Sequence, residues 1–408
     1  MAEQHGKALV PQIRFAGFTD PWEQRKLSST CEQLSRTINP LETPNEEFTE
    51  YSMPAFDNNE TAETVIGNSM NSLRKIVDRP CLLVNKLNVR KKRIWHVPRP
   101  EANAVCSSEF VPFSSHSSDL SFIKISLLSE RITAYLESCS SGSSNSQKRV
   151  TPEIIMSSEI IAPSLAEQRR IGAFFDRLDS LITLHQRKYD KLCVLKKSML
   201  DKMFPKGGSL YPEIRFAGFT DPWEQRKLGD ILQERNVRTS DFESNPIFSL
   251  TIEDGITPKT DRYERTSLIT KTEDLFKIVS PNEFVTNPMN LRFGAFGYNK
   301  NSFSVCVSGY YDVFSIDNDK CSGFWNSYFK TSVALKRFDD AATGSLIEKR
   351  RVKYSTLCQL IFLMPKGMDE KKRIGAFFDR LDSLITLHQR KLELLRNIKK
   401  SMLDKMFV

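Results

Sequence analysis

The sequence is poor in the side chains on which many catalytic and metal sites depend. It has five histidines in 408 residues, and they are widely separated. A nucleophile paired with a histidine base is therefore not expected. The eight cysteines include no CxxC pair and no Cys/His cluster. We therefore expect reduced, mostly buried thiols and no metal site.

Motifs for nucleotides and cofactors are also missing. No GxxxxGK[ST] loop occurs, so ATP hydrolysis by this chain is not expected. A base-amino methyltransferase would carry a glycine-rich loop and an Asn/Asp-Pro-Pro-aromatic motif. The nearest approaches, at 245–248 and 20–22, lack the second proline and are better explained as turns. We predict no catalytic residues and no cofactor, although common carboxylate and lysine patterns leave a nuclease site open.

No apolar run approaches the roughly 18 residues of a membrane span. The first ten residues also lack the apolar core of a signal peptide. We therefore expect a cytoplasmic protein with no membrane partner. The length suggests two to three domains, and the formal charge of +9 at pH 7 favours a polyanionic partner such as nucleic acid.

What the sequence does contain is an internal duplication. Residues 11–27 match residues 212–228 at 16 of 17 positions. Residues 170–204 match residues 373–407 at 29 of 35 positions, and the first nineteen of these are identical. We call the first pair the boxes. The order box, variable region and long segment thus occurs twice, so we interpret the chain as two copies of one fold with a pseudo-twofold internal repeat.

The two variable regions retain only short echoes of each other. NKLNVR at 85–90 aligns with NPMNLR at 287–292, at an offset of 202. The stretch PKGGSLYP at 205–212 is a break between the copies, and SCSSGSSNS at 138–146 is typical of an exposed loop. The halves have therefore diverged mainly between the box and the long segment.

The long segment has the pattern of a helix that pairs with another. From residue 167 to residue 204 there is no proline and one glycine, Gly172. Apolar residues recur every seven positions, which keeps one stripe facing a partner helix. We predict a long antiparallel two-helix coiled coil, about 57 Å long at about 1.5 Å per residue. The predicted seam consists of Ile171, Phe174, Leu178, Leu181, His185, Leu192, Leu195, Ile374, Phe377, Leu381, Leu384, His388, Leu395 and Ile398.

Two histidines of this seam fall near the helix midpoints. We expect His185 and His388 to approach each other near the pseudo-twofold axis. A packed polar residue that fixes the register is the simpler interpretation. A metal site is not expected there, because no carboxylate or thiol is grouped with them.

Basic, aromatic and polar residues gather in the variable regions. They can neutralise phosphates, and Asn, Gln and Arg can read base edges. A solvated face is the simpler interpretation of any single run, but Arg90/Arg292 and Arg149/Arg351 fall at equivalent places in both copies. The candidate DNA-binding residues are Asn85, Lys86, Arg90, Lys91, Lys92, Arg93, Gln147, Lys148, Arg149, Asn287, Asn290, Arg292, Lys300, Arg350, Arg351 and Lys353.

Three stretches carry a family resemblance: IRFAGFTDPWEQRKLG at 214–229, EQRRIGAFFDRLDSLITLHQRK at 167–188 and KKSMLDKMF at 399–407. In this order they resemble the specificity (S) subunits of type I restriction-modification systems. The resemblance implies an α/β (α+β) fold with two target recognition domains that have sheet-rich cores. These would be residues 1–165 and 206–367. Two conserved helices would separate them and dock partners, at 166–205 and 368–408.

The resemblance also implies a division of labour. Each recognition domain would read one half of a bipartite, asymmetric site in double-stranded DNA. Two modification subunits would methylate adenine with S-adenosylmethionine, and two restriction subunits would use ATP and Mg²⁺ to translocate and cleave DNA. This chain would be a non-catalytic subunit that holds none of these cofactors.

Two other classes of function compete with this interpretation. One is a two-domain protein-interaction scaffold with a coiled-coil docking region and no specific DNA recognition. The other is a stand-alone methyltransferase or nuclease, which would need activity from the isolated chain. Salt-dependent, sequence-selective DNA binding separates the recognition subunit from the scaffold, because phosphate contacts release counterions.

Overall fold

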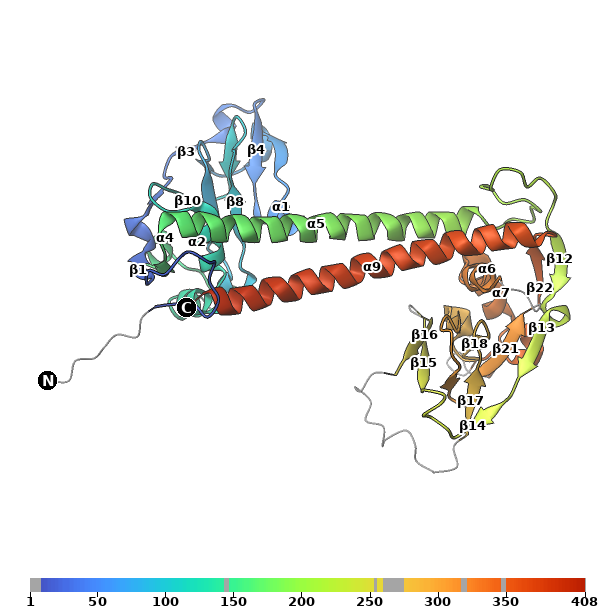
Figure 1. Cartoon of the computed structure of the whole chain (residues 1–408). Coiled ribbons are helices and arrows are strands. Elements are labelled where there is room, and N and C mark those ends of the chain that lie inside the picture. The colour runs from blue at the N-terminus through green and yellow to red at the C-terminus, as the bar shows by residue number, and fades with distance from the viewer. Residues whose placement is uncertain are drawn as a thin grey trace. The chain divides into compact units, whose positions relative to one another are not determined.

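A computed structural model describes residues 9–142, 147–252, 255–259, 275–316, 321–345 and 350–407. The chain divides into two compact units (Figure 1), of which unit 1 is residues 1–186 with 390–408 and unit 2 is residues 187–389. Both mix sheets and helices, which confirms the α/β class. The units differ from the four predicted segments, because each holds parts of both long helices. The predicted loop at 138–146 lies partly outside the described residues.

Unit 1 is built on two sheets. The first has the order β2-β10-β7-β8 with antiparallel neighbours, and the second has the order β3-β6-β9-β4-β5, in which β4 and β9 are parallel. A separate antiparallel pair joins β1 to β11. The strands are β1 (Glu23–Lys26), β2 (Cys31–Gln33), β3 (Thr37–Ile38), β4 (Glu47–Tyr51), β5 (Glu63–Ile66), β6 (Arg74–Ile76), β7 (Cys81–Asn85), β8 (Ile94–Val97), β9 (Ala104–Cys106), β10 (Phe110–Ser115) and β11 (Glu159–Ala162).

The four-stranded sheet of unit 1 is buried on both faces. Strand β7 has no alternation of polar and apolar residues, as expected for a strand covered on both sides. Leu82 and Val84 face a core that includes the start of α5 (Leu165–Lys202), whereas Cys81 and Leu83 face a core shared with the second sheet. The shorter helices are α1 (Met53–Asp57), α2 (Leu120–Leu127), α3 (Glu130–Ser138) and α4 (Pro152–Met156).

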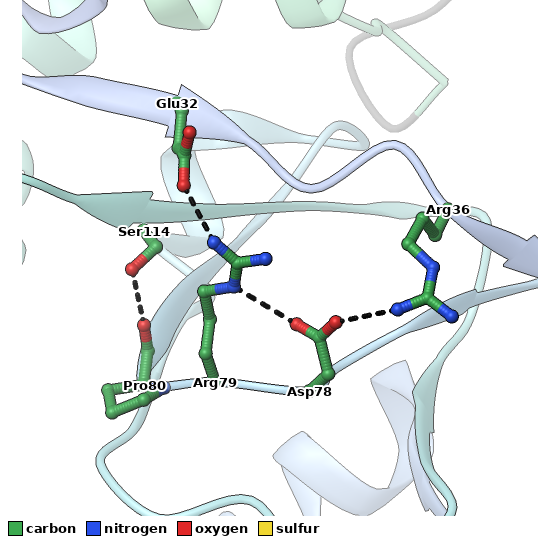
Figure 2. Close-up of polar contacts among 6 residues, drawn as sticks. All are labelled: Glu32, Arg36, Asp78, Arg79, Pro80 and Ser114. Carbon is green, nitrogen blue, oxygen red and sulfur yellow. Dashed lines mark hydrogen bonds and ion pairs between the residues drawn. The ribbon is translucent and has the colours of Figure 1, made fainter.

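A chain of ion pairs ties the two sheets of unit 1 together where the backbone crosses from β6 to β7 (Figure 2). The Asp78 carboxylate accepts from Arg36 at 3.0 Å and from Arg79 at 3.2 Å. Arg79 also pairs with Glu32 of β2 at 2.9 Å. Exposed pairs of this kind contribute about 0 to 1 kcal/mol each, so they orient the crossing more than they stabilise the core.

Unit 2 has a similar four-stranded sheet, but its remaining strands are arranged differently from those of unit 1. Its four-stranded sheet has the order β13-β21-β18-β19, and three smaller sheets are β14-β17-β20, β15-β16 and β12-β22. Its elements are β12 (Glu224–Lys227), β13 (Leu232–Arg235), β14 (Arg238–Thr239), β15 (Phe248–Thr251), β16 (Gly255–Pro258), β17 (Phe276–Val279), β18 (Phe284–Thr286), β19 (Phe296–Tyr298), β20 (Val305–Val307), β21 (Asp312–Ile316), β22 (Ile361–Met364), α6 (Ser322–Tyr328), α7 (Ser332–Ala341), α8 (Tyr354–Leu357) and α9 (Met368–Met406).

Each unit contains the start of one long helix and the end of the other. In unit 1, Phe175 of α5 packs in the same core as Met406 of α9. In unit 2, Phe378 of α9 packs with Phe204, which directly follows α5. The ring of Phe204 also stacks on Tyr328 at 4.7 Å between centroids. The end of each helix therefore completes the core around the start of the other.

The predicted seam residues differ in where they lie. Ile171, Leu178, Ile374 and Leu381 are buried, and Phe174, Leu192, Phe377, Leu395 and Ile398 are partly buried against the two cores. Leu181, His185, Leu384 and His388 are half-buried. The expected approach of the two histidines concerns residues of different units and stays a prediction.

Leu195 is the exception among the predicted seam residues. It is 39% exposed, which contradicts its place in the seam. The neighbouring Lys196 pairs with Asp382 at 2.5 Å.

A buried ion pair joins each box to the start of a long helix. Arg14 makes two bonds of 2.7 Å to Glu167, and Arg215 makes bonds of 2.6 and 2.8 Å to Glu370. The Glu167 side chain is 0% exposed and that of Glu370 is 3% exposed. Bidentate pairing with arginine provides the compensation that a buried carboxylate requires.

The glycine of each long segment marks a close approach. A Cβ on Gly172 would lie 2.5 Å from a carboxylate oxygen of Asp119, the residue that caps α2. A Cβ on Gly375 would lie 2.7 Å from the backbone nitrogen of Phe324 in α6. Glycine at this position thus allows each long helix to pack directly on a short one.

Replacing Phe204 by alanine should destabilise unit 2 by about 3 to 5 kcal/mol, because the change leaves a cavity among packed aromatic rings. Val194→Ala is the matched control, since Val194 lies on α5, ten residues before Phe204, and is 69% exposed. We expect the control to change stability by no more than about 0.5 kcal/mol. Denaturant unfolding with hydrogen exchange of unit 2 peptides measures both. Equal stability of the two variants would contradict a core role for the end of α5.

Candidate functional site

In unit 1 the basic run folds around a short turn, η4 (Val89–Lys91), between β7 and β8. Asn88 and Lys92 flank it with φ of 53° and 48°. Asparagine adopts this left-handed conformation readily, whereas lysine does so at a cost of about 1 kcal/mol or more. The Lys92 ammonium is fixed by the Leu128 carbonyl at 2.8 Å and the Glu130 carboxylate at 2.6 Å. The turn is therefore anchored at the junction of α2 and α3.

A second segment lies beside this turn. Arg149 forms isolated β-bridges with Leu87 and Ser141. The backbone nitrogen of Asn88 donates to the Lys148 carbonyl at 2.9 Å. The sequence places these segments about 60 residues apart, and the backbone bonds bring their basic side chains together.

An open pocket of about 450 Å³ lies between the two segments and the end of α3. Cations from both segments line it together with one carboxylate. A pocket of this composition can hold an anion. Its lining residues are Asn88, Val89, Arg90, Lys91, Glu137, Ser140 and Lys148.

Unit 2 contains the same arrangement. The turn η6 (Leu291–Phe293) lies between β18 and β19 and ends at Gly294, which has a φ of 94°. The accompanying segment forms a β-bridge between Thr343 and Arg351. The nitrogen of Val352 donates to the Pro288 carbonyl at 2.9 Å, as Val150 does to Lys86 at 3.0 Å in unit 1.

One ion pair holds each turn to a helix. Arg90 bonds to Glu137 of α3 at 2.5 Å, and Arg292 bonds to Asp339 of α7 at 3.1 Å. Both members of the pair are offset by 202 residues. The hydrogen bond from Arg90 also lowers the pKa of Glu137. The equivalence of Arg90 and Arg292 therefore has an explanation within the protein.

This pairing corrects the assignment of Arg292 as a DNA contact. Its side chain is only 10% exposed, whereas that of Arg90 is 68% exposed. Arg292 also lies over the ring of Phe293, 4.3 Å from its centroid. In this structure Arg292 supports the turn, and Arg90 retains a surface that a ligand can reach.

Two other candidates point into the protein, so their assignment as DNA contacts is wrong for this structure. Asn85 is 4% exposed, and its side-chain oxygen accepts from the nitrogen of Leu87 at 2.9 Å. Arg93 is 9% exposed and makes two bonds to Asp57 of α1, at 2.7 and 2.5 Å. Both sit at the ends of buried strands, where polar groups must be paired inside the protein.

Lys300 and Arg350 are also engaged elsewhere. Lys300 follows β19, at the opposite end of that strand from η6, and pairs with Asp379 of α9 at 3.3 Å. Arg350 donates to the carbonyls of Asp339 at 2.8 Å and Ala342 at 3.0 Å. These two bonds lie at the end of α7. Neither side chain lies in the same group as the residues around η6.

The remaining candidates gather around the two turns and form two unequal groups. We call them the η4 cluster and the η6 cluster. The first is mainly cationic, and Arg149 in it also pairs with Glu109 at 2.6 Å. The second combines amides with cations. The η4 cluster is Lys86, Arg90, Lys91, Gln147, Lys148 and Arg149, and the η6 cluster is Asn287, Asn290, Arg351 and Lys353.

Sequence reasoning missed the aromatic residue of the second turn. Phe293 is 52% exposed, although it is large and apolar. The available signal was its alignment, at an offset of 202, with the basic run of unit 1. Its equivalent in unit 1, at an offset of 202, is Lys91.

Titratable groups elsewhere are engaged in the fold. Burial lowers the pKa of His96, which lies 3.4 Å from the Ser121 hydroxyl. All eight cysteines are within the described residues, none of them forms a disulfide there, and five are buried. Among the residues that the structure describes, no three His, Cys, Asp or Glu side chains are grouped to hold a metal. Over the same residues, no helix combines the length and apolarity that crossing a bilayer requires.

Solved structures with a similar fold span nearly the whole chain. One is described as a type I restriction-modification system S subunit from M. genitalium, with 13% identity over 98% of this chain and 99% of that chain, and a TM-score of 0.59. A HsdS subunit from Thermoanaerobacter tengcongensis has 17% identity, coverage of 95% and 96%, and a TM-score of 0.41. A chain from a structure of type I R-M complex assembly has 18% identity, coverage of 95% and 97%, and a TM-score of 0.45.

A family comparison matches the first part of the chain. Residues 20–193 match the family described as type I restriction modification DNA specificity domain. The match covers the sheets of unit 1, the η4 cluster and most of α5. Over residues 20–193, the chain is therefore similar to this specificity domain family.

Proposed function

We propose that the chain is the DNA-recognition subunit of a type I restriction-modification complex and reads a bipartite, asymmetric target. One observation carries this proposal. The two units present the same turn, held by the same ion pair, with unequal side chains around it. Recognition of two different half-sites requires the same supporting turn in both units and different base-reading side chains on each.

The proposed contacts divide between phosphate and bases. In the η4 cluster, Arg90 and Lys148 come from two segments, line an open pocket and can neutralise phosphates. In the η6 cluster, Asn290 supplies an exposed amide, which can pair with an adenine edge, whereas the side-chain oxygen of Asn287 accepts from the nitrogen of Met289 at 3.0 Å. The half-site of unit 2 would therefore depend less on charge than that of unit 1.

Catalysis would belong to other chains. We assign adenine methylation to two modification subunits and ATP-dependent cleavage to two restriction subunits. S-adenosylmethionine, ATP and Mg²⁺ would bind to those partners, and this chain would direct them to the target. The family match supports a specificity role for the chain.

The long helices would form an antiparallel coiled coil that sets the spacing of the two half-sites about a pseudo-twofold axis. Asp179 of α5 pairs with Lys399 of α9 at 2.5 Å within unit 1. Within unit 2, Asp382 of α9 pairs with Lys196 of α5 at 2.5 Å. These pairs are equivalent at an offset of 203, which supports one helix-to-helix register used twice.

Mapping methylated adenines in DNA exposed to this chain with a modification partner tests the proposal. We expect one motif with two unequal half-sites and a fixed spacer. Sequence-independent binding that does not weaken as salt rises would instead favour the protein-interaction scaffold. Methylation or cleavage by the isolated chain would contradict the non-catalytic assignment.

Replacing Lys148 by alanine should weaken DNA binding by a similar factor for all sequences, because a phosphate contact carries no sequence information. The slope of log affinity against log salt should fall by about 1. Lys26→Ala is the control, since Lys26 is exposed on β1 of the same unit, outside the η4 cluster. Titrations of the assembled complex at several salt concentrations measure the slope. An unchanged slope would remove Lys148 from the interface.

Exposed leucines in the identical segments offer two equivalent docking positions. Leu184 is 46% exposed and its equivalent Leu387 is 45% exposed. We expect Leu184→Asp and Leu387→Asp each to release one modification subunit, and the double variant to release both. Mass photometry counts the bound subunits. Val194→Asp is the control, because Val194 is exposed but is replaced by Asn397 in the second copy. Full assembly of the double variant would contradict this docking surface.

A further inference from the structure

We infer that Lys91 and Phe293 are specificity-determining residues that occupy one equivalent position in two half-site readers. Lys91 would select a guanine, and Phe293 would select a thymine through its methyl group. The inference rests on the proposed function and adds the base-reading chemistry of each turn. Sequence alignment places the two residues 202 positions apart, each as the last residue of its turn.

Both turns are held firmly before the last residue. The arginine preceding Lys91 or Phe293 bonds to the equivalent acidic residue of α3 or α7. The next residue, Lys92 or Gly294, has a left-handed backbone that ends the turn. A side chain carried on such a turn is positioned in advance, so little conformational entropy is lost when it contacts a base.

The two turns share this backbone frame, and they differ most in the chemistry of their last residue. Lys91 is exposed at the mouth of the pocket that also contains Lys148. Phe293 is 52% exposed and is held by the guanidinium of Arg292, 4.3 Å from its ring centroid. The contact with Arg292 fixes the ring without burying it. One turn thus offers a cation and the other an apolar surface.

The two side chains suit different base edges. In the major groove, guanine presents two acceptors, N7 and O6, to which a lysine ammonium can donate. Thymine presents a C5 methyl group, with which phenylalanine makes an apolar contact. Exchange of the two side chains should therefore exchange preferences at single base positions and leave the frame unchanged.

The test uses the full chain assembled with its modification partner. Lys91→Phe and Phe293→Lys are made singly, and the methylated motif is mapped for each. We expect each variant to change one base position in one half-site, with a drop of about tenfold or more in preference for the original base. The two variants should affect different half-sites. Lys91→Arg should retain the guanine, because arginine donates to the same acceptors.

Two matched variants control for surface charge and shape. Phe303→Lys changes a phenylalanine that is 50% exposed at the other end of β19. Lys26→Phe changes an exposed lysine on β1. Both should methylate the wild-type motif. Phe293→Leu keeps an apolar side chain and should retain the thymine with weaker preference, which separates loss of contact from loss of folding.

The outcomes separate this inference from the proposed function. If both exchange variants methylate the unchanged wild-type motif, the roles of Lys91 and Phe293 are overturned. The proposed function as a recognition subunit would still stand. A change in both half-sites from one variant would also overturn them. If wild-type complexes methylate no defined motif, the proposed function itself fails.

Discussion

Each unit depends on a carboxylate that is buried at the start of a long helix. Glu167 and Glu370 would each destabilise their core by several kcal/mol if left without a partner. The arginine that meets each of them comes from a box more than 150 residues earlier in the chain. This contact explains why box and helix are the two segments with near-identical copies. They touch each other, so neither can diverge alone. Contact between box and helix thus accounts for near-identity at buried positions, whereas the proposed docking of two partners would account for it only at exposed positions such as Leu184 and Leu387.

The second constraint is that the core of each unit needs residues from both long helices, the start of one and the end of the other. The aromatic group around Trp22 includes Phe407 from the end of the chain, and the group around Trp223 includes Phe204. The backbone repeats this relation, because Ile13 donates to Lys405 and Ile214 donates to Lys202. Each box therefore contacts the start of one helix and the end of the other. A substitution at the end of one long helix therefore affects the core of the unit that contains the start of the other long helix.

The sequence predicted the two long helices and the mixed α/β class, because these depend on local patterns of apolar residues. It did not predict which members of a basic run face outward. Arg93 and Lys91 are two residues apart, yet one is buried against Asp57 and the other is exposed. That distinction depends on α1, which lies more than 30 residues earlier. Arg292 is likewise predicted from the sequence as a DNA contact, because its partner Asp339 is 47 residues away and no local pattern connects them.

This misinterpretation is instructive about where specificity can reside. Residues that are equivalent in both units maintain the shared frame, and a residue that maintains a frame is constrained by its partner inside the protein. Two readers of different DNA sequences must differ at the positions that touch bases. Equivalence between the halves is therefore evidence for a structural role, and difference on a fixed turn is evidence for a reading role. By this reasoning the arginines identify the turns, and under the proposed function the unequal side chains that follow them would determine what each turn recognises.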